Sequence, residues 1–492
     1  MDWKNLLSKK TLAEREPEPK EWEKYPISPF ENDYKAIISS AAFRRLQDKT
    51  QVFPLDKSDF VRTRLTHSIE VSTIAKQLGV MITDNTTSYR NDDFDSNTIK
   101  ADLPTVLACA GLLHDLGNPP FGHFGEIVIG DWFKEKLTKN EINNTFAYKG
   151  QPIYDIINNN KSDTKQMYND LCHFEGNAQS LRILSKINNK PDGYDVNLSY
   201  AVINALIKYP CNSLDFVKDS PDIKVHKPGY YLAEKDVFDE ICNATGTKSG
   251  NKYYRHPLAY LMEAADDIAY ATSDLEDALK KGLFNVDQFI DYFNDEIRKI
   301  DDYTKKKKSK ELIENLENRI NHLEVRNREN EIIEFQKWSI FAKGWLMYVV
   351  VFSFSKNYKA IMKGDYESDL FKDGFHSYSL EILKGAMSKF VFNSGEILRL
   401  ELSANKIISS LLDDFVPAVI HWEINDKDYK PSKTDKKLIE LISDNYRQDY
   451  LHAKTDNEHY NLYLRFLMVT DFISGMTDSY AKSLYQKLNG IE

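Results

Sequence analysis

Apolar residues recur at intervals of three and four along most of this chain. The clearest set is Leu312, Leu316, Ile320 and Leu323. This spacing places side chains on one face of an α-helix, and similar stripes run through 34–45, 181–187, 260–279 and 404–415. Alternating patterns typical of strands are few, and the best candidate is a short hairpin near 225–232. The pattern therefore predicts an all-α fold with at most a small β-hairpin.

The helical pattern shows no internal repeat and no clean linker. Two polar stretches rich in Asn and Asp, 84–99 and 138–168, are typical of surface loops or insertions. We expect an N-terminal arm (1–30), a helical core (31–290) and a helical C-terminal region (291–492) packed on that core.

Charge and composition narrow the class of protein. The net charge is −10 over 492 residues, so no overall basic surface favours nucleic acid. The one dense basic run, 305–310, is best interpreted as a solvated helix start. Four scattered cysteines without a CxxC pair favour reduced thiols. The N-terminus lacks a signal-peptide core, and the longest apolar run, 345–352, is too short to span a bilayer. We therefore expect a cytoplasmic protein without membrane contact.

One short stretch concentrates groups that bind metals or transfer protons. His114 and Asp115 follow an apolar helical run, and a Gly/Pro-rich turn leads on to His123 and Glu126. An isolated His-Asp pair is more often a solvated helix end than a ligand pair. Here the neighbouring groups favour a functional site.

Two other segments carry matching ligand types. His67 lies on a probable helix upstream, and a downstream apolar helix carries Asp266 and Asp267. Imidazole and carboxylate groups together suit a divalent cation, and four such ligands leave positions for water or a phosphate oxygen. Successive helical residues point about 100° apart, so only one of the two aspartates is expected to be a ligand.

The spacing of His123 and Glu126 would place them on one face of a short helix. A carboxylate beside an imidazole orients the ring and raises its basicity, which suits proton transfer. A surface histidine beside a helix-capping glutamate is the alternative, and the sequence alone leaves it open.

These motifs resemble the HD-domain phosphohydrolases and, more closely, the bacterial deoxyguanosine triphosphate triphosphohydrolases. The similarity is carried by the blocks 43–54, 64–67, 114–126, 173–179, 227–231, 263–277 and 471–478. Segment 290–460 matches only in length and apolar pattern. The resemblance implies a Mn²⁺ or Mg²⁺ ion held by His67, His114, Asp115 and Asp266. It also implies that His123 and Glu126 form the catalytic pair.

The resemblance further implies a substrate site. Arg64, Lys208 and Lys227 would bind the triphosphate, and no Gly-x-x-x-x-Gly-Lys-Ser/Thr loop is present to do so. Glu175 and Asn177 are expected near the site, with no role assigned.

For the sugar, Gln51 and Asp274 resemble positions that bind the 3′-hydroxyl. Tyr270 lies four residues after Asp266 and four before Asp274, so the three share a helix face. Its ring would crowd the 2′ position, and an ordinary core aromatic is the alternative.

The resemblance implies hydrolysis of dGTP to deoxyguanosine and inorganic triphosphate. One alternative is a dNTPase of relaxed base preference that a nucleotide activates. Others are an HD phosphodiesterase for a cyclic or alarmone nucleotide, and a non-catalytic nucleotide- or single-strand-binding sensor. Blocks 44–54 and 173–179 disfavour the phosphodiesterase, and the intact ligand set disfavours the sensor. A homo-oligomer such as a hexamer, and regulation by single-stranded DNA, are also implied.

Overall fold

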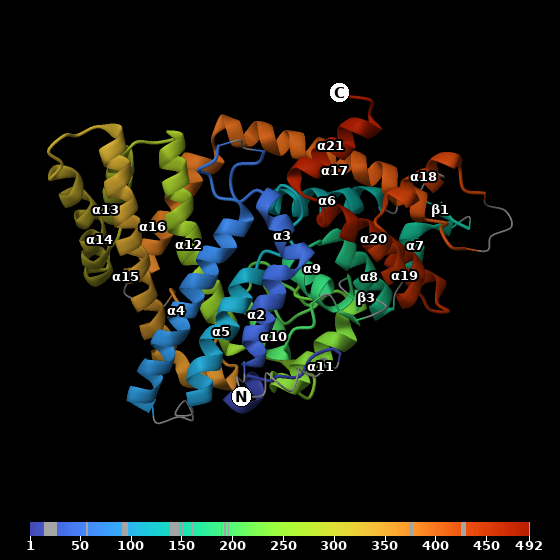
Figure 1. Ribbon diagram of the computed structural model, residues 1–492, viewed down its shortest axis with the longest axis horizontal. Coiled ribbons are helices and arrows are strands. Elements are labelled where there is room, and N and C mark those ends of the chain that lie inside the picture. Colours follow the sequence, from blue (N-terminus) through green and yellow to red (C-terminus); the bar gives the residue numbers. More distant parts are fainter. Residues whose placement is uncertain are drawn as a thin grey trace.

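The computed structural model is dominated by helices (Figure 1), which confirms the predicted all-α class. It describes residues 1–491 apart from 14–26, 56–57, 91–96, 138–146, 150, 159–160, 188, 191–192, 195, 373–376 and 425–429. In the first half the helices are α1 (Trp3–Leu6), α2 (Pro29–Ser39), α3 (Ala41–Arg45), α4 (Arg64–Arg90), α5 (Asn97–Leu113), α6 (His123–Lys136), α7 (Ile153–Ile157), α8 (Ser162–Cys172), α9 (Gly176–Arg182), α10 (Tyr200–Leu206) and α11 (Lys235–Thr245).

The second half continues the helical pattern. Its helices are α12 (Pro257–Lys281), α13 (Val286–Arg298), α14 (Tyr303–Asn321), α15 (Arg328–Lys363), α16 (Ser377–Met387), α17 (Gly395–Val419), α18 (Lys433–Leu441), α19 (Asp444–Ala453), α20 (Glu458–Ser474) and α21 (Asp478–Leu488). The predicted stripes at 260–279 and 404–415 lie within α12 and α17, the stripe at 34–45 spans α2 and α3, and the stripe at 312–323 lies on α14 apart from its last two residues.

Helices α4 and α5 pack closely and form the frame of the site. A Cβ at Gly111 would lie 2.6 Å from the Cα of Ser72, and one at Gly79 would lie 2.8 Å from the Cα of Pro104. Only glycine allows backbones to approach this closely. The approach at Gly111 sets the end of α5, which His114 follows directly, against the first turns of α4, which carry His67.

The long helix α12 packs against both of these helices and against α15. The side chain of His256 accepts a hydrogen bond from the backbone N–H of Leu258 at its start, and Gly282 ends it with φ +78°. Such caps satisfy backbone groups that a helix end would otherwise leave unpaired. This helix delivers Asp266 to the same place as the two histidines.

The C-terminal helices cover the site from another side. In Figure 1, α17 runs alongside α6, and α20 lies below it. A buried ion pair joins Arg182 of α9 to Asp471 of α20, with Nη2 2.7 Å from Oδ2. Glu234 contacts the same guanidinium at 2.7 Å. Chain segments almost three hundred residues apart therefore share one core.

The hairpin expected near 225–232 is wrong. That segment holds two short 3₁₀ helices, Ile223–Val225 and Leu232–Glu234, and an extended stretch between them. The N–H of Gly229 donates to the carbonyl of Cys211 at 2.9 Å, so the segment pairs with 209–211 and not with itself. The strands in the described residues form three two-residue hairpins instead: β1 (Ala147–Tyr148) with β2 (Gln151–Pro152), β3 (Asn189–Lys190) with β4 (Gly193–Tyr194), and β5 (Lys248–Ser249) with β6 (Lys252–Tyr253).

The two predicted loop regions are also partly wrong. Helix α4 continues to Arg90 and α5 begins at Asn97, while 91–96 lie outside the described residues. Within 138–168, of which 138–146, 150 and 159–160 are not described, α7 buries Ile153, Ile156 and Ile157. Their three- and four-residue spacing is helical, and the surrounding Asn and Asp residues obscured it.

One described helix, α15, is long and apolar enough to cross a membrane by length and composition. Half of its most apolar window is buried inside the protein. A core helix passes the same test, so this is weak evidence for a membrane span.

Candidate functional site

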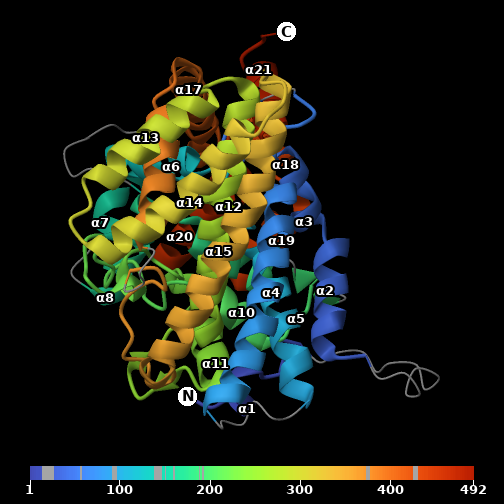
Figure 2. The same ribbon diagram turned by 90° about the vertical axis from the view of Figure 1, so that its left-hand side faces the viewer.

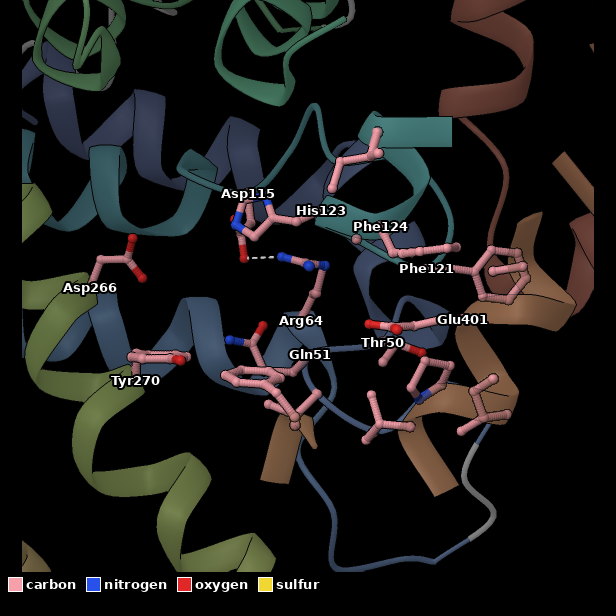
Figure 3. Close-up of a pocket in the computed structure, with 18 of the residues that line it drawn as sticks. Thr50, Gln51, Arg64, Asp115, Phe121, His123, Phe124, Asp266, Tyr270 and Glu401 are labelled. Atoms are coloured by element: carbon pink, nitrogen blue, oxygen red, sulfur yellow. Dashed lines mark hydrogen bonds and ion pairs between the residues drawn. The ribbon is translucent and has the colours of Figure 1, made fainter. Parts of the chain in front are cut away.

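A cavity of about 600 Å³ opens where α4, α5, α6 and α12 meet the C-terminal helices. Figure 3 shows Arg64, Asp115, Asp266 and Tyr270 converging on it. Its polar and aromatic lining includes Gln51, Arg64, Asp115, His123, Asp266, Asp267, Tyr270, Lys384, Phe392 and Glu401. Residues from both halves of the chain therefore build one site.

Three of the four predicted metal ligands come together here. Donor atoms of His67, His114 and Asp266 lie within 4.8 Å of one another. Oδ1 of Asp266 is 3.2 Å from Nε2 of His67 and 3.4 Å from Nε2 of His114. Nδ1 of His114 lies 2.8 Å from the carbonyl of Gly111, so it is the protonated nitrogen and Nε2 is left to face the cluster.

The donor set fits a divalent cation. Nε2 of His114 is buried and has no hydrogen-bond partner among the described residues. Unpaired buried polar atoms are costly, and a bound cation would satisfy this one. Burial lowers the pKa of His114, but Asp115 and Asp266 outweigh it and raise that pKa to about 10. The surroundings therefore favour positive charge at this point.

The fourth predicted ligand, Asp115, lies beside the cluster. Its Oδ2 is 3.4 Å from Nε2 of His114 and is paired with the guanidinium of Arg64. The amide of Asn118 donates to Oδ1 at 2.6 Å. Burial raises the pKa of Asp115, but Arg64 and His114 together hold it well below its usual range. The carboxylate is thus ionised and close to the other donors.

His123 and Glu126 form a hydrogen-bonded pair at the cavity wall. Nδ1 of His123 lies 2.8 Å from Oε2 of Glu126. Oε1 of Glu126 accepts the N–H of Gly176 at 2.9 Å, and the carboxylate is buried. The pairing raises the pKa of His123, chiefly through the charge of Glu126. Glu126 therefore orients the imidazole and does not cap a helix in solvent.

A turn with a strained backbone directly precedes His123 and sets the position of its side chain. Phe121 and Gly122 have φ of +64° and +63° immediately before α6 begins at His123. Non-glycine residues rarely adopt such values. A Cβ at Gly122 would lie 2.4 Å from Nη2 of Arg64. Glycine at this position therefore leaves room for the guanidinium of Arg64 beside the turn.

The predicted phosphate-binding cations are each paired with a carboxylate. Arg64 pairs with Asp115, while Nζ of Lys208 lies 2.8 Å from Oδ2 of Asp266. Nζ of Lys227 lies 3.0 Å from Oε1 of Glu175. Arg64 lines the cavity, whereas the two lysines lie outside its lining.

Glu175 and Asn177 lie next to the His123–Glu126 pair. Nδ2 of Asn177 donates to Oε1 of Glu175 at 2.7 Å. Burial raises the pKa of Glu175, and the neighbouring Glu126 raises it further. These two residues lie behind the cavity wall and do not line the cavity itself.

Of the three predicted sugar-binding residues, two line the cavity and one does not. Gln51 and Tyr270 line the cavity, but Asp274 is buried behind it. Burial raises the pKa of Asp274 to about 7, and its other neighbours include His67 and Gln51. The ring of Tyr270 stacks on Phe392 with centroids 6.4 Å apart and an interplanar angle of 11°. Tyr270 is therefore a wall of the cavity and not an ordinary core aromatic.

Lining residues from segment 290–460 were not predicted from the sequence, among them two charged residues and one aromatic residue. Lys384 comes from α16, Phe392 follows it, and Glu401 comes from α17. No local motif surrounds them, and segment 290–460 carried only a helical pattern. Lys384 lies 2.7 Å from Oδ1 of Asp267, which is thereby paired away from the metal-type cluster.

Two buried charged residues, Lys49 and Asp478, link the C-terminal segment to this site through separate hydrogen bonds. Asp478 accepts the N–H groups of Thr50 and Phe121 at 3.0 Å each. Nζ of Lys49 donates to the carbonyls of Asn118 and Ser474 at 2.6 and 2.7 Å. The loop that carries Gln51 and the turn that precedes His123 are thus held by the same segment.

Comparison with known proteins agrees with this geometry. The HD domain family matches residues 64–182, which contain His67, the His114-Asp115 pair and His123. The site and the match together define an HD-domain hydrolase.

Relatives extend the similarity over nearly the whole chain. A deoxyguanosinetriphosphate triphosphohydrolase-like protein of Listeria monocytogenes is 45% identical over 94% of both chains. The deoxyguanosinetriphosphate triphosphohydrolase of Serratia proteamaculans is 31% identical over 95% of this chain and 94% of its own. That of Klebsiella pneumoniae is 31% identical over 97% of each. The chain belongs to the deoxyguanosinetriphosphate triphosphohydrolase family and is a hydrolase.

Proposed function

We propose that the protein is a metal-dependent dNTP triphosphohydrolase that prefers dGTP. It would convert dGTP and water to deoxyguanosine and inorganic triphosphate. One observation carries this proposal: the His67–His114–Asp266 cluster and the His123–Glu126 pair belong to the same site. The names of the relatives support the substrate class.

His67, His114, Asp115 and Asp266 would hold a Mn²⁺ or Mg²⁺ ion. Such an ion polarises a phosphoryl oxygen and acidifies a bound water. In this structure Arg64, Lys208 and Lys227 each pair with a carboxylate. With substrate bound, these three cations would also bind phosphate oxygens, because guanidinium and ammonium groups bind phosphate strongly.

His123 and Glu126 would move the proton. Nδ1 of His123 is engaged by Glu126, so Nε2 is the atom that exchanges a proton with substrate or water. Its raised pKa keeps the imidazolium populated, which suits protonation of the departing 5′-oxygen.

The sugar and base would occupy the rest of the cavity. Gln51 and Asp274 would bind the 3′-hydroxyl, and Tyr270 would leave no room for a 2′-hydroxyl. Glu401 supports the dGTP preference, because a carboxylate can accept both N–H groups on the Watson–Crick edge of guanine. Adenine offers no such pair of donors there.

The proposal extends to the state of the protein. We propose an arm (1–30), an HD-type catalytic core (31–290) and a C-terminal region (291–492) that completes the cavity. We further propose a cytoplasmic homo-oligomer, such as a hexamer, that single-stranded DNA can regulate. A dNTPase of relaxed base preference that requires a nucleotide activator is the second candidate. The open, largely apolar end of the cavity around Phe392 favours it.

Product analysis tests the proposal. Metal-stripped protein would be incubated with each dNTP and with GTP, with and without Mn²⁺ or Mg²⁺. We expect inorganic triphosphate and deoxynucleoside only with metal, and fastest from dGTP. Pyrophosphate or a nucleoside monophosphate as product would contradict the proposal, while hydrolysis of all four dNTPs only after a second nucleotide is added would favour the second candidate.

A further inference from the structure

The longest described helix, α15, presents an apolar surface to solvent. The exposed residues in its middle are Ile340, Phe341, Gly344, Tyr348 and Phe352. The side chains of Ile340 and Tyr348 are 69% and 68% exposed. Figure 2 shows α15 running beside α4 along this side of the molecule. Residues this apolar are seldom gathered on a solvated face.

Helical geometry makes these residues a single stripe. At about 100° per residue, all of them point within about 80° of Gly344. A Cβ built at Gly344 would meet nothing within 4 Å, so packing inside this chain does not require glycine there. Glycine inside a helix is destabilising relative to alanine, because it loses more backbone freedom on folding. A glycine at the centre of an exposed apolar stripe lets a second backbone approach closely.

Helix α4 adds two exposed apolar residues beside this stripe, with the exposed Lys76 between them. Ile69 and Val80 are 48% and 47% exposed. They lie eleven residues apart and therefore point within about 20° of each other. Because α4 packs along α15, the two exposed stripes belong to one side of the protein. We call this surface, defined by Ile69, Val80, Ile340, Gly344, Tyr348 and Phe352, the α15 face.

Charges at the two ends of the stripe are complementary to each other. Glu329 lies fifteen residues before Gly344 and Lys359 lies fifteen after it, and both are exposed. If a second α15 crosses antiparallel at Gly344, Glu329 of each copy faces Lys359 of the other. The same crossing sets Ile340 of one copy against Tyr348 of the other. A two-fold interface needs such a self-complementary pattern.

We propose that the α15 face joins two copies of this chain about a two-fold axis at Gly344, with the two α15 helices antiparallel. The proposal rests on the homo-oligomer of the proposed function and names the surface that forms it. It assigns no catalytic role to the face, whose residues lie outside the lining of the reaction cavity.

Disulfide cross-linking tests the position of the axis. The four native cysteines are buried, so Gly344→Cys adds one exposed thiol. A two-fold axis at this residue brings the two thiols together, and mild oxidation should give a cross-linked dimer. Lys299→Cys, at the exposed residue that follows the end of α13, is the matched control and should stay uncross-linked at the same protein concentration.

Charge reversal tests the register. Glu329→Lys or Lys359→Glu alone should raise the dimer dissociation constant several-fold, measured by sedimentation velocity. The double variant should restore the wild-type value, because each pair is re-formed with its signs exchanged. Tyr348→Glu should abolish the dimer by placing a charge in the apolar centre.

Three outcomes would overturn the proposal. One is a monomeric wild-type protein. Another is an oligomer whose mass Tyr348→Glu leaves unchanged and that Gly344→Cys does not cross-link. The third is sedimentation of the wild type, but not Tyr348→Glu, with phosphatidylcholine–phosphatidylserine vesicles, which would assign the face to a membrane. Hydrolysis of dGTP is measured separately for each variant, so failure of the face and failure of the proposed activity give different results.

Discussion

Replacement of His123 by alanine separates proton transfer from metal binding. His123 contacts Glu126 and does not belong to the three-residue cluster of donor atoms. Its side chain is 70% exposed, whereas that of Glu126 is 7% exposed. The substitution should therefore leave both the fold and the metal content unchanged.

The expected magnitude follows from the role of the imidazole. A positioned general acid or base contributes about 10²–10⁴ in rate. At about 1.4 kcal/mol for each factor of ten, His123→Ala should add about 3–5 kcal/mol to the activation free energy. The loss should appear in kcat with little change in KM, because His123 acts on the reacting bond.

Glu126→Gln completes the test through a double-mutant cycle. Glu126 acts by orienting His123, so the double variant should be no slower than His123→Ala alone. The assay is steady-state release of inorganic triphosphate, with metal content measured on the same samples. His322→Ala, at the exposed end of α14, is the control and should match wild type. Loss of metal from His123→Ala, or a rate within about threefold of wild type, would refute this reasoning.

Other consequences of the structure can be measured independently. Because Glu126 raises the pKa of His123, activity that needs the imidazolium should fall as pH rises through that pKa. In Glu126→Gln this fall should occur at lower pH, and an unmoved pH–kcat profile would contradict the role. Tyr270→Ala should narrow the difference in kcat/KM between dGTP and GTP, and an unchanged ratio would show that the ring does not exclude the 2′-hydroxyl. Asp478→Ala removes the acceptor of the buried N–H of Phe121 and of the partly buried N–H of Thr50, at about 1–3 kcal/mol for the buried group, so it should lower Tm and kcat together while metal content stays intact. Normal kcat in folded Asp478→Ala would show that the segment only stabilises the fold.

The metal-type cluster was predictable because short motifs carry its residues. His114 and Asp115 are adjacent in sequence, and His67 and Asp266 stand in distinctive blocks on helices. The all-α class was predictable for a similar reason, since apolar periodicity is a local signal.

The opposite wall of the cavity was not predictable in this way. Glu401 lies at the site because α17, which carries it, packs against α6. That contact joins segments more than two hundred residues apart. The spacing of apolar residues within either segment does not indicate that the two helices pack together. The hairpin near 225–232 failed for a related reason, because the backbone of that segment bonds to Cys211 and not to itself.

The proposed reaction requires water to attack the α-phosphorus, because release of intact triphosphate breaks the bond between that phosphorus and the nucleoside 5′-oxygen. Hydrolysis of dGTP in H₂¹⁸O by the Mn²⁺-loaded protein, with products resolved by mass spectrometry, tests it most directly. The account predicts one ¹⁸O atom in inorganic triphosphate and none in deoxyguanosine. Labelled dGMP with pyrophosphate, labelled dGDP or labelled orthophosphate would each contradict it.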